Sequence, residues 1–263
     1  MEIIFLLVSF LASVVGAICG IGGGIIIKPV LDATGVMGVS EISFLSGCTV
    51  LSMAVISVLK SLKRKDKSID LKQGTALAIG AAAGGIAGKI LFEYAYAICP
   101  SKEQVGAIQA ATLLIITIAT LVYTLLQKKI QTHTVKNLLI CIIIGLFLGI
   151  LSSFLGIGGG PINLVVLAFF FSMDTKIAAA NSLYIILFSQ AASLINSITC
   201  SNIPKVNLGI LFIMVTGGVA GGLIGSKINK KISNKGVNRL FIALMVIIIF
   251  ICIYNILKFT VIC

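Results

Sequence analysis

The chain has 263 residues, of which 59% are hydrophobic and only 11% are charged. The core of a soluble protein of this length cannot bury so many apolar side chains, which excludes a soluble globular domain. The net charge of +12 does not indicate nucleic-acid binding, because the basic residues lie in short loops between apolar segments, as in membrane proteins. We therefore expect an all-α integral membrane protein in contact with lipid and without a nucleic-acid partner.

Eight apolar segments follow one another along the chain, separated by short polar loops. They span residues 3–36, 42–62, 73–92, 105–126, 138–173, 178–198, 207–226 and 240–257. Six have the length of one crossing, since hydrocarbon about 30 Å thick needs roughly 20 residues. The first and the fifth are too long for one crossing. The first segment carries Glu2 in place of the basic start of a signal peptide, so we expect it to stay in the mature protein.

The two long segments are interrupted by the same string, Gly-Ile-Gly-Gly-Gly, at residues 20–24 and 156–160. Each interior glycine destabilises a helix by about 1 kcal/mol relative to alanine. We therefore expect both helices to break there, with free N–H groups at the positive end of a half-helix facing a cavity that suits an anion. Pro161 stands where the second half-helix would begin. The alternative interpretation is close helix packing, which small residues also allow.

A second glycine pattern repeats between the third and seventh segments, at an offset of 137 residues. It consists of Gly80, Gly84, Gly85 and Gly88, and of Gly217, Gly221, Gly222 and Gly225. The spacing by four predicts helix contact faces. Two patterns at nearly one spacing indicate a duplication, with repeats at 1–130 and 131–263 that form one membrane domain and are joined by residues 127–137.

Loop charges discriminate between two topologies. If every segment crosses once, the 20 basic residues divide almost equally between the two sides. If each glycine-interrupted segment turns back at its break, 15 of them lie on one side, which the positive-inside rule identifies as cytoplasmic. This second topology predicts a multi-pass protein of the plasma membrane with both termini outside. It also makes the two repeats inverted, each with about four helical segments, the first of which is broken.

Polar side chains at membrane depth extend the candidate substrate site. Lys28 and Asn163 follow the two glycine runs, although snorkelling to the interface is an alternative for Lys28. Hydroxyl and amide groups in the segments after each break are suited to bind substrate oxygens, and hydrogen bonds between helices are the alternative. The complete predicted site is Gly20, Gly22, Gly23, Gly24, Lys28, Ser46, Gly156, Gly158, Gly159, Gly160, Asn163, Asn181, Ser182 and Gln190.

Several chemistries are not expected. All acidic residues, Asp32 among them, fall at segment ends or in loops, which argues for an anionic or neutral substrate and against coupling through a buried carboxylate. The single histidine, His133, lies in the loop between the repeats, and neither H-E-x-x-H nor G-x-S-x-G occurs. The seven cysteines contain no C-x-x-C pair. We therefore expect no enzymatic activity, no cofactor and no metal site.

Two stretches carry a resemblance to a known family. Residues 16–24 read Gly-Ala-Ile-Cys-Gly-Ile-Gly-Gly-Gly and are followed by Pro29 and Leu31, while residues 155–160 read Leu-Gly-Ile-Gly-Gly-Gly. With these motifs, its length and its segment pattern, the whole chain resembles the sulfite exporter TauE/SafE family. Lys28 is not part of the family pattern, and Val165 stands where the second copy often has proline.

The resemblance implies a plasma-membrane permease for small sulfur-containing anions such as sulfite or sulfonates. Together with the glycine breaks, it predicts an alternating-access transporter whose partners are a small anionic substrate and membrane lipid. An anion channel, a sulfur-compound carrier working with a soluble partner protein, and a helper subunit are the alternatives. Substrate, direction, coupling ion and homo-oligomer formation are left open by the sequence.

Overall fold

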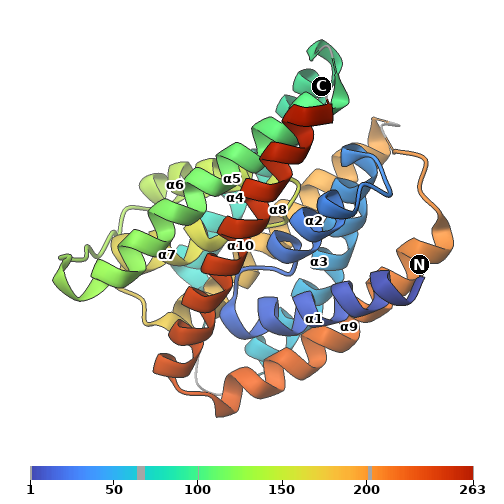
Figure 1. The fold of residues 1–263 in the computed structure, drawn as a ribbon. Coiled ribbons are helices and arrows are strands. Elements are labelled where there is room, and N and C mark those ends of the chain that lie inside the picture. Colours follow the sequence, from blue (N-terminus) through green and yellow to red (C-terminus); the bar gives the residue numbers. More distant parts are fainter. Residues whose placement is uncertain (1, 64–68, 100, 201–202, 263) are drawn as a thin grey trace.

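The computed structural model describes residues 2–63, 69–99, 101–200 and 203–262, and the secondary structure within these ranges is helical (Figure 1). Three of the basic residues used in the topology prediction, Arg64, Lys65 and Lys67, lie outside them. The helices are α1 (Glu2–Cys19), α2 (Gly24–Thr34), α3 (Val39–Leu62), α4 (Leu71–Ile98), α5 (Lys102–Leu126), η1 (Gln127–Lys129), α6 (Leu138–Phe154), α7 (Pro161–Phe171), α8 (Thr175–Thr199), α9 (Leu208–Lys231) and α10 (Asn234–Ile262).

Seven helices within the described ranges are long and apolar enough to cross a membrane, namely α1, α3, α4, α5, α8, α9 and α10. The six segments predicted to have ordinary spanning length correspond to the last six of these. The first and fifth predicted segments are each divided into two helices at the glycine run, as the sequence predicted. The chain is therefore an all-helical, multi-pass membrane protein.

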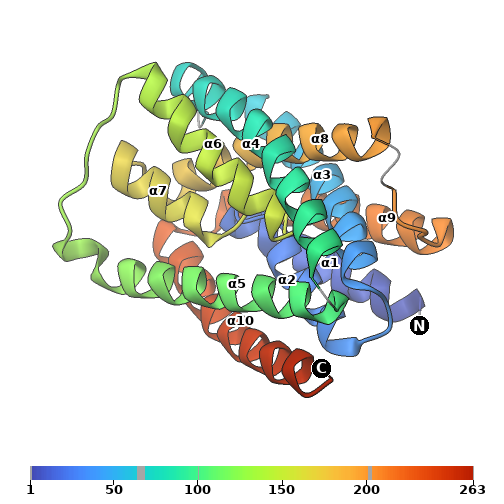
Figure 2. The same cartoon turned by 90° about the horizontal axis from the view of Figure 1, so that it is seen from above.

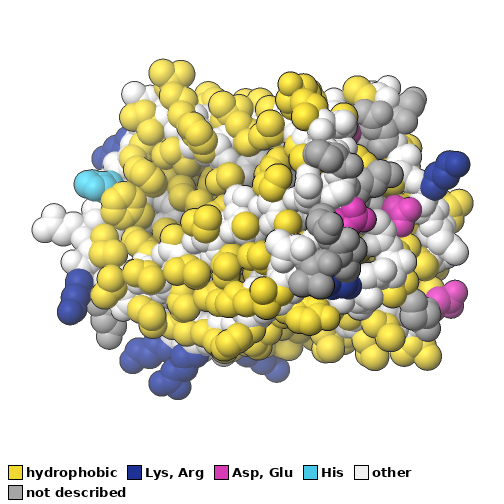
Figure 3. All heavy atoms as spheres, turned by 45° about the horizontal axis from the view of Figure 1, so that its top comes forward, with side chains coloured by type: hydrophobic (Ala, Val, Ile, Leu, Met, Phe, Trp, Pro, Cys, Tyr) yellow, Lys and Arg dark blue, Asp and Glu magenta, His cyan; other side chains and the backbone are white. Residues whose placement is uncertain are grey.

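The surface has the distribution expected for a protein in lipid. Large apolar side chains are exposed along most helices, for example Leu208, Ile115 and Phe212. In Figure 3 hydrophobic side chains cover the middle of the visible face, and charged side chains gather toward its left, lower and right margins. Serines and amide side chains are buried between the helices instead. This arrangement places apolar groups toward hydrocarbon and polar groups inside.

The glycine stripes form two close helix contacts, as predicted. A β-carbon at Gly84 of α4 would clash with the carbonyl of Leu146 on α6, and a β-carbon at Gly221 of α9 would lie 2.6 Å from the Phe10 carbonyl oxygen of α1. Small residues let the backbones approach this closely. Each pair joins one helix of the first half to one of the second, so the halves are interleaved.

Contacts along the helices also give their directions. On α9, Gly218 lies against Thr49 of α3 and Gly222 lies against Met53, so α3 and α9 are parallel. Helix α9 is also parallel to α1, because Gly217 lies against Ser9 and Gly225 lies against Ala17. Helices α1 and α3 therefore start at the same end of the bundle. The intervening α2 must therefore carry the chain back.

The second half reverses in the same way. The loop before α6 donates hydrogen bonds to the end of α7, from the His133 amide to the Phe169 carbonyl (2.7 Å) and from the Val135 amide to the Phe170 carbonyl (2.9 Å). The start of α6 and the end of α7 thus lie together, at the left of Figure 2, whereas both chain termini are at the right. Gly47, in the first half of α3, lies against Gln190 of α8, whereas Ser57, late in α3, shares a hollow with Ala179 at the start of α8. These two helices are therefore antiparallel, and the two hairpins point toward each other.

Candidate functional site

The two glycine runs meet in the middle of the bundle. A β-carbon at Gly22 would lie 3.2 Å from the Gly158 carbonyl oxygen, and one at Gly159 would lie 3.5 Å from the Ile21 carbonyl oxygen. Ile21 and Ile157, the isoleucines within the runs, are almost completely buried. The tips of the two hairpins are therefore packed directly against each other.

Glycine is required in these runs by backbone conformation. Gly20 and Gly22 have φ angles of 77° and 73°, and the residues 136 positions later, Gly156 and Gly158, have φ angles of 63° and 67°. Left-handed conformations of this kind cost other L-residues roughly 1–2 kcal/mol each. The repeated string thus begins with the same two left-handed glycines in both copies, and the copies differ at the next residue, where Gly23 has φ −69° and Gly159 has φ 126°.

Each run leads directly into the N-terminus of a half-helix. Gly23 is the N-cap of α2 and Gly160 is the N-cap of α7, which begins at Pro161 as predicted. Within the described chain, neither start has a side-chain cap. By helix geometry the amides of Gly24, Ile25 and Ile162 lack an intrahelical acceptor, whereas Pro161 has no N–H and the Asn163 amide donates to the Gly160 carbonyl (3.2 Å). Both starts carry the positive end of a helix dipole. Together these ends have the electrostatics of an anion site.

The residues around the breaks repeat with the same offset of 136. A β-carbon at Gly22 would lie 3.4 Å from Val50 and 3.5 Å from Ile186, which are themselves 136 residues apart. Gly20 packs against Ala179 of α8, whereas Gly156 packs against Ser43 of α3. The site is thus built from two nearly equivalent halves.

Buried hydroxyl groups without partners line α3 and α8 beside the breaks. Ser46 and Ser182, also 136 residues apart, are both 0% exposed, and among the described residues neither hydroxyl has a hydrogen-bond partner. The Ser46 hydroxyl would lie 2.8 Å from a β-carbon on Gly24, the first residue of α2. Leaving such a group unpaired costs about 1–3 kcal/mol, which a bound ligand would recover.

The other predicted polar residues divide into two groups. Asn163 lies in the first turn of α7, is buried, and keeps an oxygen without a partner among the described groups. Asn181 instead donates to the Ile177 carbonyl and accepts from the Asp70 amide (3.1 Å), so its side chain joins α8 to the start of α4. Gln190 donates to the Ser152 hydroxyl at 3.5 Å.

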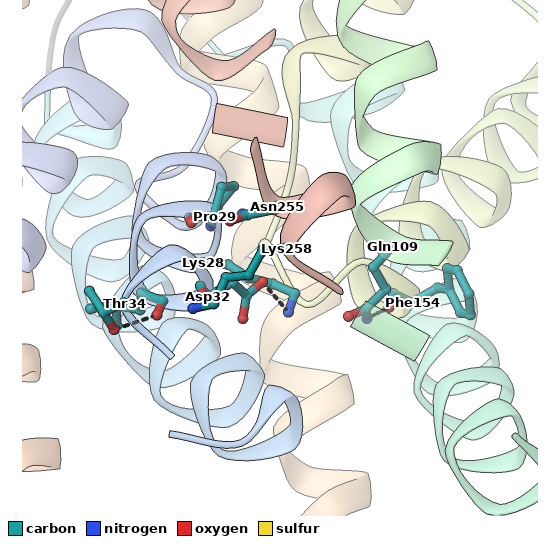
Figure 4. Close-up of polar contacts among 9 residues, drawn as sticks. Lys28, Pro29, Asp32, Thr34, Gln109, Phe154, Asn255 and Lys258 are labelled. Atoms are coloured by element: carbon teal, nitrogen blue, oxygen red, sulfur yellow. Dashed lines mark hydrogen bonds and ion pairs between the residues drawn. The ribbon is translucent and has the colours of Figure 1, made fainter. Parts of the chain in front are cut away.

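The structure overturns the snorkelling alternative for Lys28 and the expectation that no carboxylate is buried. Lys28 does not snorkel, because it is 2% exposed and its Nζ lies 3.0 Å from Oδ2 of Asp32 (Figure 4). Asp32 lies within α2 and is only 7% exposed, so a buried carboxylate is present despite the sequence prediction. The reason is the reversal of the chain, which places the end of α2 against α10 rather than at a free segment end.

Sequence reasoning missed Gln109 of α5 and Asn255 of α10, which line a small cavity together with Lys28 and Asp32. Gln109 donates to the Phe154 carbonyl, and Asn255 donates to the Pro29 carbonyl at 2.9 Å. Both are amide side chains within apolar segments, and that is the signal that would have identified them.

A further hollow beside the first break is polar. It lies where α1, α3 and α9 end and α8 begins, and its lining includes Ser57, Ala179, Ser226 and Asn229. Ala179 connects it to the break through its contact with Gly20. A larger hollow between α3, α8 and α9 is lined almost entirely by apolar side chains and is unsuited to an anion. Among the described residues, no group of three His, Cys, Asp or Glu side chains is arranged to hold a metal ion.

Comparison with known proteins gives one match. The family model described as "Sulfite exporter TauE/SafE" matches residues 5–251 of the chain. No curated protein and no solved structure matches it. The family match covers both glycine breaks and all of the polar groups described above except Asn255.

Proposed function

The chain belongs to the TauE/SafE sulfite exporter family, and from this premise we propose that it is a plasma-membrane permease for a small sulfur-containing anion such as sulfite or a sulfonate. The observation that carries the proposal is the meeting of two uncapped half-helix starts at Gly23 and Gly160. Amides and dipoles at both starts favour negative charge, and the sulfonate group offers three oxygens to receive their hydrogen bonds.

Serine hydroxyls complete the proposed anion site. Ser46 and Ser182 are buried beside the breaks, and each has a hydroxyl without a partner within the described chain. Asn163 adds a buried amide in the first turn of α7. Lys28 is one helical turn beyond Gly24 and supplies positive charge. These residues and the two glycine runs are the substrate-binding groups in our proposal.

Alternating access is the proposed mechanism, with residues 1–130 and 131–263 acting as inverted repeats. The helix directions support it, since α1 runs parallel to α9 and α6 runs parallel to α4, while α3 and α8 are antiparallel. The tight contact between Gly22 and Gly158 closes the centre, so an anion passes only when the hairpin tips separate. Rocking of one half against the other would open the site to each side in turn.

The test is uptake of ³⁵S-labelled anions by proteoliposomes containing the purified protein. Sulfite and methanesulfonate are compared in wild type, Ser46→Ala and Ser182→Ala, with Ser197→Ala as the matched control. Ser197 is buried on α8 like Ser182, but its hydroxyl already donates to the Ser193 carbonyl at 3.1 Å.

We expect saturable uptake in wild type. Each site variant should raise KM about 10- to 100-fold, because a hydrogen bond to a charged group contributes roughly 1.5–3 kcal/mol. The control should retain the wild-type KM. Uptake unaffected by either site substitution would refute the proposed site. Flux that does not saturate would indicate a channel, and absence of flux for every anion would refute the permease.

A further inference from the structure

A second polar cluster lies between α2, α5 and α10, outside the glycine breaks. Lys28, Asp32, Gln109 and Asn255 line one small cavity, and none of these side chains is more than 7% exposed. Figure 4 shows them on three helices, with the Lys28–Asp32 pair lying between Asn255 and Gln109. Four buried polar side chains in a membrane protein are costly and indicate a functional site.

Three oxygens in this cluster are acceptors without a donor. The amide nitrogens of Gln109 and Asn255 are used by the carbonyls of Phe154 and Pro29, which fixes their orientation and leaves their side-chain oxygens free. Within the described chain, Oε1 of Gln109, Oδ1 of Asn255 and Oδ1 of Asp32 have no hydrogen-bond partner. A ligand that fits must therefore bring a hydrogen-bond donor or a positive charge.

The charges around Asp32 favour a proton over a metal cation. Lys28 lies 3.0 Å from Oδ2, and Lys258 of α10 donates to the main-chain carbonyls of Asp32 (3.3 Å) and Ala33 (3.0 Å). The thiol of Cys252, also on α10, faces the same cavity. On their other side, α1 and α3 cover α2 with apolar residues. A metal ion would thus be a third positive charge beside two ammonium groups, whereas a proton neutralises the carboxylate.

We propose that this cluster is a proton-binding site that couples proton movement to anion transport, with Asp32 as the proton acceptor. The inference rests on the proposed permease function. A proton taken from water binds Oδ1 of Asp32. The resulting carboxyl O–H then donates a hydrogen bond to the side-chain oxygen of Gln109 or Asn255. One bound proton thus provides partners for two of the three unpaired acceptors.

Protonation also releases Lys28 from its ion pair. Lys28 follows Gly24 by four residues, about 6 Å along the helix axis, and its long flexible stem can turn toward the helix N-terminus. There its ammonium group becomes the counter-ion of the bound anion. The anion and the proton leave together on the other side, where the carboxylate loses its proton to water and pairs again with Lys28. No covalent bond of the anion changes.

The coupling is reciprocal by thermodynamic necessity. An anion that attracts Lys28 weakens the ion pair and so favours the proton on Asp32, and the proton favours the anion to the same extent. The matched pair for comparison is Lys89 with Glu93 on α4. Their charged atoms are 3.6 Å apart with the same spacing of four residues, but the Glu93 side chain is 26% exposed and lies outside the cluster.

The experiment uses proteoliposomes with ³⁵S-methanesulfonate, an anion of a strong acid that carries no proton itself. The membrane potential is clamped to zero with potassium and valinomycin, and a pH gradient of about one unit, acidic outside, is imposed. One proton per anion predicts about tenfold accumulation in wild type. The readout is the accumulation with the pH gradient divided by the accumulation without it. This ratio should fall to about one in Asp32→Asn and stay near ten in Glu93→Gln.

A second measurement needs no variant and remains decisive if Asp32→Asn does not fold. Methanesulfonate is added to wild-type protein in weakly buffered detergent solution containing a pH indicator, and we expect proton uptake that saturates with anion binding. Saturable uptake of methanesulfonate that neither responds to the pH gradient nor is accompanied by proton binding would refute the coupling site. The proposed permease function would then still stand. Accumulation driven by a sodium gradient instead would also overturn the coupling site. Absence of any methanesulfonate or sulfite transport would refute the permease itself.

Discussion

The contact between the hairpin tips predicts different effects for alanine at two equivalent glycines, Gly24 and Gly160. A β-carbon at Gly24 would lie 2.5 Å from the Ile157 carbonyl carbon and 2.8 Å from the Ser46 hydroxyl. Because backbone atoms cannot move aside by changing rotamer, we expect overpacking to cost about 1–3 kcal/mol. The helix propensity of alanine offsets at most about 1 kcal/mol of this. Gly160 has an extended φ of −161°, and its β-carbon would meet only the end of the flexible Ile157 side chain at 3.3 Å.

The measurement is thermal unfolding in detergent, followed with a thiol-reactive fluorescent dye. Cys19, Cys141 and Cys252 are free and completely buried, so the dye reports loss of the fold. For a net cost of about 1–2 kcal/mol and a shift of about 2–4 °C per kcal/mol, Gly24→Ala should lower the apparent Tm by roughly 2–8 °C. Gly160→Ala should lose only a small N-cap contribution, about 0.5–1 kcal/mol. Equal shifts for the two variants, or a larger shift for Gly160→Ala, would refute the packing of the tips described here.

Three further predictions concern topology and packing. A maleimide that cannot cross the membrane should label the exposed Cys200 in intact cells, and in a Cys200→Ser background it should label Ser233→Cys only after permeabilisation. The reverse pattern would contradict an outside N-terminus. Gly84→Leu should lower the apparent Tm by several degrees by forcing α4 from α6, whereas Ala83→Leu on the exposed face of α4 should not. Lys258→Met should lower the apparent Tm by a few degrees, because two carbonyls at the end of α2 lose a charged donor.

Most of the architecture could be predicted from the sequence because it depends on local rules. Hydropathy identified the six ordinary spanning helices, and the glycine runs identified both breaks. The two glycine stripes, one containing Gly84 and the other Gly221, predicted contact faces on α4 and α9, though not that α6 and α1 would lie opposite them. The inverted orientation of the repeats stays a prediction that the labelling experiment tests.

The polar interior was harder to predict, because it depends on which helices become neighbours. Asn181 and Ser182 are adjacent in sequence and equally buried, yet the Asn181 amide contacts the start of α4 while the Ser182 hydroxyl has no partner among the described residues. Asp32 was misassigned because a position near a segment end was equated with the membrane surface. Gln109 reaches the cluster only because α5 packs beside α10.

The ion pair also distinguishes the two halves of the protein. The left-handed glycines and the flanking serines recur at an offset of 136, and the N-caps of the half-helices recur at an offset of 137. The residues 136 positions after Lys28 and Asp32, however, are Leu164 and Ala168. An anion at the hairpin tips would therefore meet similar hydrogen-bond donors from both halves and a movable positive charge from only one. In an alternating-access cycle, the two open states would then share anion contacts but differ in solvent access to the carboxylate. That asymmetry is what a site needs to load a proton on one side and release it on the other.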